Sequence, residues 1–391
     1  MDATLIHDLD ALRERNLFRH LRRVDSPQSA HIQIDGAPCL NFSSNDYLGL
    51  ANHPALKQAA IQAIEKFGAG SGAARLVCGT LAPFAQLETV LTKFKQTPAA
   101  LSFSTGYAAA LGTICALMGS GDIIIVDKLV HASIVDAAKL SGAKIRVFAH
   151  NDLGDLEKKL KWAADSRTTS TKSRVLVITE SIFSMDGDAA SLREIVVLKQ
   201  KYGAWLMVDD AHATGILGKN GRGLADEFGI GSQIEIQMGT LGKALGASGG
   251  FICGSRPLID TLVNRARSFI FSTAPVPAAA AAATAGVQMT QSPEGEKLRQ
   301  RLKSLVKQFQ AETRSQKSKI PGAIIPIIIG NETKAIKAAE KLSEQNIYVP
   351  AIRYPSVARG AARLRVTLTA AHSSDDISRL AGALKSLDIG F

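Results

Sequence analysis

Lys243 is the side chain in this sequence best placed for nucleophilic chemistry. It lies in the segment Thr240-Leu-Gly-Lys-Ala-Leu-Gly-Ala-Ser-Gly-Gly250, directly after the apolar run 234–238. The small neighbours allow tight turns and the close approach of a bulky group, and an amine shielded from water can act as a nucleophile or bind a carbonyl carbon. A surface lysine in a glycine-rich loop has the same local pattern, so the interpretation depends on the residues around it.

Other polar residues follow short β-branched segments that we predict to be strands. The segment Ser104-Thr-Gly-Tyr-Ala108 opens a helix and offers N–H groups and a helix dipole to a phosphate, although any capped helix start has the same features. His131, Ser184, Asp209 and His212 follow three further strands. Ligands of open α/β sheets bind at the carboxyl ends of the strands. These residues therefore form one candidate site.

The chemistry of this set points to one cofactor. Asp209 and Asp210 could hold a divalent metal, but residues one apart in a strand point to opposite faces, so no metal ion is expected. One ligand uses all the groups: a phosphate at the Gly106 helix, an aromatic ring beside His131, a ring nitrogen facing a carboxylate, and an aldehyde on Lys243. Pyridoxal 5'-phosphate has these parts, and its protonated ring takes up the electrons of a Cα carbanion.

An α/β domain must position these residues. From residue 99 onward short strands alternate with helices, which is typical of a largely parallel sheet. Seven strands are predicted, at 100–103, 123–126, 145–148, 175–179, 206–208, 234–238 and 250–253. The segment 166–174 is rich in Ser, Thr and Lys and is predicted to be an exposed loop. The alanine-rich tract 278–285 is predicted to be a packing helix.

Helices and strands are also predicted on both sides of this domain. The helices lie at 3–23, 54–67, 294–314, 333–344 and 375–387, and the strands at 31–34, 39–42, 324–329, near Tyr348 and at 364–368. We expect residues 1–44 to join a small domain, 45–289 to form a large cofactor-binding domain, and 290–391 to form a small α+β domain. The GxGxxG/A-like stretch at 68–73 follows a helix, so it is not expected to bind a dinucleotide.

The composition describes a globular protein. The chain has 391 residues, of which 46% are hydrophobic and 21% charged, and its formal net charge is +11. That charge suits nucleic acid, an acidic protein or an anionic substrate, but the basic residues are scattered and aromatic residues make up only 5%, which disfavours nucleic acid. The four cysteines form no CxxC pair, and we find no signal peptide or membrane span. We expect a cytoplasmic protein.

Several motifs resemble a known family in order and spacing. They are Asn45-Asp-Tyr-Leu-Gly-Leu50, Ala149-His-Asn-Asp152, Thr179-Glu180 with Phe183-Ser-Met-Asp-Gly-Asp188, Val208-Asp-Asp-Ala-His212, Thr240-Leu-Gly-Lys243 and Arg363-Leu-Arg365. Together they resemble the α-oxoamine synthases, which are fold-type I pyridoxal-phosphate-dependent transferases, over nearly the whole chain. The resemblance implies a large domain with a mostly parallel seven-stranded sheet, a smaller α+β domain, and a homodimer whose active sites lie at the subunit interface.

The resemblance also implies a role for each cofactor-binding residue. Lys243 would bind the aldehyde and later move the Cα proton, Asp209 would pair with the ring nitrogen, and His131 would stack on the ring. His212 and Ser184 would bind near the phenolic oxygen. The residues implied to hold the phosphate are Gly106, Tyr107 and Thr240, with Thr273 reaching in from a second subunit.

The implied reaction is an acyl transfer. Arg365 would bind an amino-acid carboxylate as a bidentate fork, with Asn45 nearby, and Arg22 would face the acyl substrate. The resemblance is to the branch of biotin biosynthesis, which implies a decarboxylative condensation of L-alanine with pimeloyl-CoA or pimeloyl-acyl carrier protein. The positive net charge suits such an anionic thioester.

Alternatives within and outside the family stay open. Relatives often carry a histidine near Phe84 and an asparagine at the position of Ala110, and Cys78-Gly-Thr80 resembles the 2-amino-3-oxobutyrate CoA ligase branch. That ligase, a 5-aminolevulinate synthase or a serine palmitoyltransferase-like enzyme is therefore an alternative. A non-catalytic binding protein on the same fold and a basic nucleic-acid binder are alternatives of other classes.

Overall fold

The computed structural model describes residues 1–167, 173–314 and 322–387. The chain divides into two compact units. The small unit comprises Met1–Gly49, Met185–Gly187 and Gln300–Phe391, and the large unit comprises Leu50–Ser184 and Asp188–Arg299. The expected boundaries were 44/45 and 289/290. In the structure the second division falls inside helix α13 (Pro293–Thr313).

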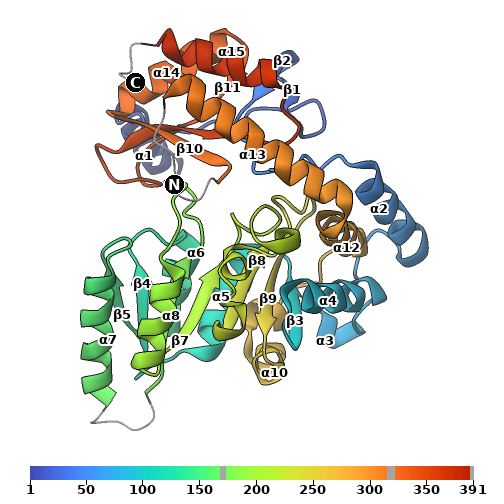
Figure 1. Ribbon diagram of the computed structural model, residues 1–391, viewed down its shortest axis with the longest axis vertical. Helices are drawn as coiled ribbons and strands as arrows, with labels where there is room; N and C mark the ends of the chain where they lie inside the picture. Colours follow the sequence, from blue (N-terminus) through green and yellow to red (C-terminus); the bar gives the residue numbers. More distant parts are fainter. Residues whose placement is uncertain (168–172, 315–321, 388–391) are drawn as a thin grey trace. The chain divides into compact units, whose positions relative to one another are not determined.

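The large unit is built on one seven-stranded sheet, which can be followed in Figure 1. The strand order is β3-β9-β8-β7-β6-β4-β5. Only β9 runs antiparallel to its neighbours, so the expected mostly parallel sheet is confirmed. The strands are β3 (Ala99–Phe103), β4 (Ile123–Asp127), β5 (Lys144–Phe148), β6 (Val175–Glu180), β7 (Trp205–Asp209), β8 (Ile236–Thr240) and β9 (Gly250–Gly254).

Helices cover both faces of the sheet because alternate strand residues point to opposite faces. Leu101 and Ile252 belong to a core that includes α5, α6 and α10, whereas Ala100 and Phe251 belong to a core that includes α4 and α12. The helices of this unit are α2 (Pro54–Phe67), α3 (Arg75–Cys78), α4 (Ala82–Lys95), α5 (Gly106–Leu117), α6 (Ala132–Ser141), α7 (Leu153–Arg167), α8 (Leu192–Lys201), α9 (Leu224–Glu227), α10 (Arg256–Arg265), α11 (Arg267–Ile270) and α12 (Pro277–Gln291).

The small unit holds two three-stranded sheets. One has the order β1-β2-β11 and the other β10-β13-β12, and β10 pairs with β13 antiparallel. The strands are β1 (His31–Ile34), β2 (Ala37–Asn41), β10 (Ile324–Gly330), β11 (Ile347–Tyr348), β12 (Ala351–Ile352) and β13 (Ala362–Thr367). Its helices, besides α13, are α1 (Asp2–Glu14), α14 (Glu332–Glu344) and α15 (Ser374–Lys385).

Three sequence predictions need correction. The first helix ends at Glu14 instead of residue 23, because Asn16 adopts a left-handed conformation with φ 56° that stops the helix. Strand β8 begins at Ile236, two residues later than predicted, because a 3₁₀ turn occupies Gly231–Gln233. The predicted loop 166–174 begins inside α7, and residues 168–172 of it lie outside the described part.

No helix within residues 1–167, 173–314 and 322–387 is long and apolar enough to cross a bilayer.

Candidate active site

The candidate residues of the large unit follow the carboxyl ends of five strands. Gly106 follows β3, His131 follows β4, Ser184 follows β6, Asp209 ends β7, and Lys243 follows β8. These five strands run in one direction, because β9 is antiparallel to both β3 and β8. The fold therefore brings the ends of these strands to one edge of the sheet.

Lys243 and His212 are in direct contact at this edge. The Nζ atom of Lys243 lies 2.7 Å from Nε2 of His212. His212 is buried, and Lys243 is half-buried. An amine in this position is shielded from bulk water and has a base or hydrogen-bond partner at hand. This is the arrangement that nucleophilic lysine chemistry requires.

Asp209 supplies a buried carboxylate beside this pair. Its Oδ1 accepts a hydrogen bond of 3.0 Å from the Ala211 N–H. Burial raises the pKa of Asp209, while the charge of Lys243 and the Ala211 hydrogen bond oppose that rise. Asp210 is separate: its Oδ2 accepts from Lys95 Nζ at 2.9 Å. The two adjacent carboxylates therefore have different partners, as expected for consecutive residues at a strand end.

His131 is the N-cap of α6. Its Nδ1 accepts from the Ser133 N–H at 3.2 Å and contacts Ser133 Oγ at 2.8 Å. Partial burial lowers the pKa of His131, the charge of Lys243 adds to this effect, and the charge of Asp209 opposes it. An imidazole ring fixed by its own helix cap presents a flat face for stacking. The shared electrostatic effects link His131 to Lys243 and Asp209.

The start of α5 forms a close-packed cradle. Thr105 caps this helix by accepting from the Ala108 N–H at 3.0 Å, and the first-turn N–H groups of an α-helix have no intrahelical partner. Gly250 packs against this turn so closely that a Cβ there would lie 2.7 Å from the Gly106 nitrogen. The Cβ of Thr240 would be 3.9 Å from a Cβ at Gly106. The cradle therefore joins Gly106 and Thr240, two of the residues predicted to hold a phosphate.

Tyr107 and Thr273 complete the list of candidates in this unit. The hydroxyl of Tyr107 donates to Asp136 Oδ2 at 2.7 Å, and this bond raises the pKa of the phenol. Thr273 lines a small pocket with Arg75 and Ser102. The Tyr107 ring is thus engaged elsewhere, so its backbone N–H is the group left for a phosphate.

The three candidate substrate residues belong to the small unit. Asn45 Oδ1 accepts from Arg365 Nη1 at 3.1 Å, and it also accepts from the Tyr47 hydroxyl at 3.2 Å. Arg365 is buried and also donates to Thr367 Oγ1 at 3.0 Å. Arg22 is exposed, with its guanidinium 5.5 Å from the centre of the Tyr348 ring. The structure brings Asn45 and Arg365 together, whereas Arg22 lies beside Tyr348.

Glu180 is a residue of the site for which the sequence analysis predicts no role. It ends β6, is 2% exposed, and pairs in register with Asp209 of β7. The signal available in the sequence was an acidic residue closing an apolar strand. Its proximity to Asp209 depends on strand pairing, which a single sequence does not display.

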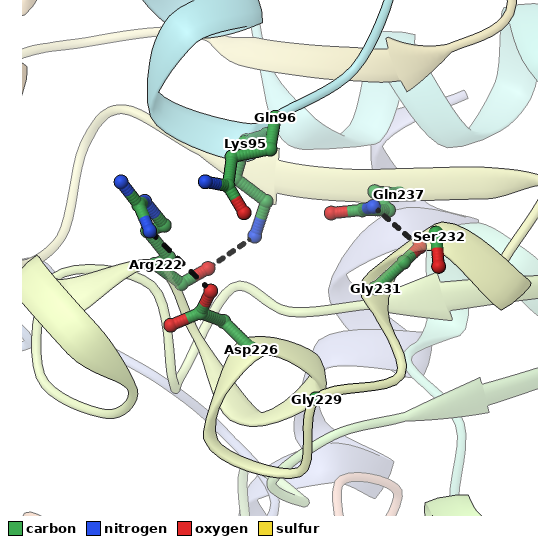
Figure 2. A pocket seen from close by; sticks show the side chains of 8 residues that line it. All are labelled: Lys95, Gln96, Arg222, Asp226, Gly229, Gly231, Ser232 and Gln237. Atoms are coloured by element: carbon green, nitrogen blue, oxygen red, sulfur yellow. Dashed lines mark hydrogen bonds and ion pairs between the residues drawn. The ribbon is translucent and has the colours of Figure 1, made fainter.

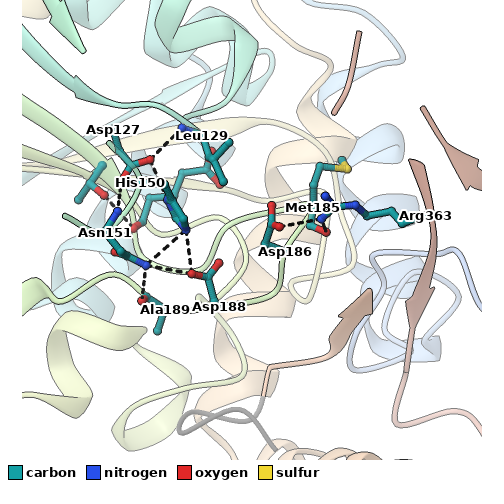
Figure 3. Close-up of polar contacts among 11 residues, drawn as sticks. Asp127, Leu129, His150, Asn151, Met185, Asp186, Asp188, Ala189 and Arg363 are labelled. Atoms are coloured by element: carbon teal, nitrogen blue, oxygen red, sulfur yellow. Dashed lines mark hydrogen bonds and ion pairs between the residues drawn. The ribbon is translucent and has the colours of Figure 1, made fainter. Parts of the chain in front are cut away.

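His150 forms a second polar network in the large unit, shown in Figure 3. Its Nδ1 lies 2.9 Å from Asp127 Oδ1, and its Nε2 lies 2.8 Å from Asp188 Oδ2. The ring also meets Phe183 edge-on at 4.4 Å. Burial opposes the charged form, but the bonds to both carboxylates outweigh it and raise the pKa of His150 to about 10. The imidazolium therefore ties the end of β4 to the segment that follows β6.

Replacing His150 with glutamine should destabilise the apoprotein in a pH-dependent way. Because the folded-state pKa is raised, the stabilisation is complete below the ordinary value of 6.5 and is lost as pH rises toward about 10. We expect a loss on the order of 2 kcal/mol at pH 6, shrinking by pH 10, in urea denaturation. His53→Gln is the control, because its partner Glu294 is exposed. An equal loss at pH 6 and pH 10 would contradict the charged bridge.

A separate pocket of about 170 Å³ lies elsewhere in the large unit. Lys95, Arg222 and Asp226 are among its lining residues, and Figure 2 shows Lys95 Nζ directed at the Arg222 carbonyl oxygen. Arg222 Nη1 lies 3.6 Å from Asp226 Oδ1. None of the predicted site residues lines this pocket, and its charges already pair with one another.

Comparisons with known proteins agree with this architecture. The model of the family "Aminotransferase class I and II" matches residues 37–384. The chain is 45% identical to an 8-amino-7-oxononanoate synthase of Geobacter sulfurreducens, over 98% of this chain and 97% of the relative. It is 46% identical to the synthase of that name from Geotalea daltonii, over 97% and 96%.

Two solved structures are also similar. A serine palmitoyltransferase from S. paucimobilis with a bound PLP-myriocin aldimine superposes with a TM-score of 0.91, at 29% identity, over 98% of this chain and 96% of the other. An 8-amino-7-oxononanoate synthase from Francisella tularensis gives a TM-score of 0.74 at 30% identity, over 88% and 96%.

Proposed function

The chain belongs to the class I and II aminotransferase family and, within it, to the family of the 8-amino-7-oxononanoate synthases, and from this membership we propose that it condenses L-alanine with a pimeloyl thioester in biotin biosynthesis. The products are 8-amino-7-oxononanoate, carbon dioxide and the free thiol of coenzyme A or of an acyl carrier protein. One observation carries the chemistry: Lys243 Nζ lies 2.7 Å from His212 at the edge of the sheet that also holds buried Asp209.

The residues at this edge fit pyridoxal 5'-phosphate. Gly250 packs against the start of α5, where a Cβ on Gly250 would lie 2.7 Å from the Gly106 nitrogen, whereas the side-chain atom nearest to a Cβ at Gly106 lies 3.8 Å away. The first-turn N–H groups of α5 can bind a phosphate there. Asp209 offers a buried carboxylate to a cationic ring nitrogen, and Lys243 offers an amine to an aldehyde. When bound, this cofactor supplies an electron sink for the carbanion at the amino-acid Cα.

Each residue of the large unit then has a specific role. Lys243 takes the Cα proton of alanine and returns a proton to the product. Asp209 keeps the ring nitrogen protonated, and His131 covers the ring face. His212 and Ser184 bind near the phenolic oxygen, and the residues proposed to hold the phosphate are Gly106, Tyr107 and Thr240, with Thr273 contributed by the partner in a homodimer.

Binding of the substrates falls to the small unit. Arg365, held by Asn45 and Thr367, binds the alanine carboxylate as a planar fork, and Arg22 faces the acyl chain. The Cα of alanine then forms a bond to the thioester carbonyl carbon while the thiolate leaves. The former alanine carboxyl group departs as carbon dioxide. The net charge of +11 favours encounter with an anionic thioester.

A second candidate function within the superfamily rests on the structural similarity to a serine palmitoyltransferase. The two functions differ in amino acid and acyl chain, so a substrate grid separates them. We expect release of free thiol to peak with alanine and pimeloyl-CoA when alanine, glycine and serine are each tested against pimeloyl-, acetyl-, succinyl- and palmitoyl-CoA with pyridoxal phosphate. A peak with serine and palmitoyl-CoA would reassign the enzyme. Silence with all thioesters, including pimeloyl-acyl carrier protein, would contradict the proposed function.

A further inference from the structure

Glu180 and Asp209 form a pair of buried carboxyl groups at the end of two adjacent strands. They are Cα partners in the parallel pairing of β6 with β7, so their side chains leave the sheet on the same face. Glu180 is 2% exposed and Asp209 is 6% exposed. The Ser181 N–H donates to the Asp209 carbonyl oxygen at 2.8 Å, which fixes the two strand ends to each other. The backbones of Glu180 and Asp209 are therefore held side by side at the sheet edge.

The Glu180 carboxyl group also touches two loops of the proposed cofactor site. The backbone N–H groups of His131 and Ser184 face this carboxyl group closely enough to lower its pKa. Its Oε1 atom is buried and has no hydrogen-bond partner among residues 1–167, 173–314 and 322–387. Glu180 thus joins the loop that presents His131 to the loop that presents Ser184, beside the carboxylate of Asp209.

We propose that Glu180 is a positioning residue that works as a neutral carboxylic acid: it holds the His131 and Ser184 loops while leaving the single negative charge of the pair on Asp209. This inference rests on the proposed function, because it concerns the same site. It assigns no bond-making step to Glu180.

Electrostatics decide which of the two groups carries the proton. Two carboxylates buried side by side cannot both ionise cheaply. Burial and the charge of Asp209 raise the pKa of Glu180 well above its ordinary 4.5, and the charge of Lys243 and the N–H groups of His131 and Ser184 only partly offset this rise. The pKa of Asp209 is also raised by burial, but Lys243, the Ala211 N–H and His131 all favour its ionised form. The proton therefore resides on Glu180, and Asp209 stays available for a cationic ring nitrogen.

The protonation state is tested on the apoprotein with Glu180→Gln. A carboxyl group whose folded-state pKa is raised binds more protons in the folded than in the unfolded state, so wild-type stability falls as pH rises above about 4.5. Glutamine removes this loss. Relative to the variant, the wild-type Tm should therefore fall by roughly 2–4 °C or more between pH 5 and pH 8. If the difference in Tm between wild type and Glu180→Gln stays constant over this range, Glu180 is not a neutral acid and the proposal fails.

A matched control is Glu88→Gln. Glu88 is a glutamate of the same unit that pairs with Arg75, with Nη1 to Oε1 at 2.6 Å. Removal of this ion pair should lower the Tm of Glu88→Gln relative to wild type at pH 8. In Glu180→Gln, by contrast, the Tm of the variant should rise relative to wild type as pH rises. A matching trend in both variants would mean that the effect is not specific to Glu180, and the proposal would fail.

The positioning role is tested by cofactor affinity. In Glu180→Leu the N–H groups of His131 and Ser184 lose their acceptor, so the two loops are no longer held at the cofactor site. The dissociation constant of pyridoxal phosphate should rise by about tenfold or more. Glu180→Gln keeps a neutral acceptor and should restore the affinity to within about threefold of wild type. Full affinity in Glu180→Leu, or equal loss in both variants, would overturn the proposal.

Failure of this inference is distinguishable from failure of the proposed function. If wild-type protein neither binds pyridoxal phosphate nor releases thiol, the proposed function fails, and the stability measurement on the apoprotein still reports the state of Glu180. If the leucine variant does not fold, the glutamine variant tests the proposal by itself. Its two measurements are the pH dependence of its Tm relative to wild type and its affinity for pyridoxal phosphate.

Discussion

Replacing Lys243 with alanine should lower kcat by about 10⁴-fold or more, since in the proposed reaction both covalent attachment and proton transfer at Cα depend on this amine. The variant should also lose the covalent adduct that borohydride traps between wild-type protein and pyridoxal phosphate. The assay pairs thiol release with mass spectrometry of the reduced protein. The expectation follows from the position of Lys243, half-buried and 2.7 Å from His212.

A surface lysine provides the control for this experiment. Lys201 is exposed and pairs with Glu157 at 2.6 Å, so Lys201→Ala should keep both turnover and the trapped adduct. If Lys243→Ala kept wild-type turnover, or if the adduct remained at another lysine, the assignment of Lys243 would be wrong.

Asp209→Asn should have the second largest effect. The amide cannot carry the negative charge that keeps a ring nitrogen protonated, so we expect kcat to fall by roughly 10²–10³-fold and pyridoxal phosphate to bind more weakly. Thiol release and cofactor titration by absorbance measure the two effects. Because Asp209 is buried, the substitution removes its negative charge and leaves little room for an ion to replace that charge.

Asp210 makes a matched comparison for Asp209 because it is the next residue along the chain. It binds Lys95 at 2.9 Å, and that pair is fully buried. Asp210→Asn should therefore lower the free energy of unfolding while the absorbance of the bound cofactor stays unchanged. Unaltered cofactor affinity and turnover in Asp209→Asn would rule out the proposed pairing with the ring nitrogen.

The sheet was predictable because most of its strands are buried on both faces, with the edge strand β5 as an exception. Strand β4 consists of residues that are all buried, and such strands read as continuous β-branched runs. Their carboxyl ends then locate Lys243, His131 and Asp209 without further information. The chemistry of these residue types predicted the cofactor, and the family comparisons support the same chemistry.

The errors have equally local causes. The leucine pattern of the first helix continues to Leu21, but Asn16 takes a left-handed conformation, and Leu21 is fully exposed. Periodicity cannot reveal a helix stop when the pattern itself continues past it. Glu180 and His150 were missed for a different reason. Their roles come from partners in other strands, Asp209 for Glu180 and Asp127 for His150, and those pairings exist only in the folded chain.

The most direct test of the proposed function follows the fate of the alanine carboxyl group. L-alanine labelled at that carbon is incubated with the holoenzyme and pimeloyl-CoA, and both labelled carbon dioxide and the mass of the amino ketone are measured. We predict one carbon dioxide for each thiol released, with 8-amino-7-oxononanoate as the product. Thiol release without labelled carbon dioxide, or a product that retains the label, would contradict a decarboxylative condensation.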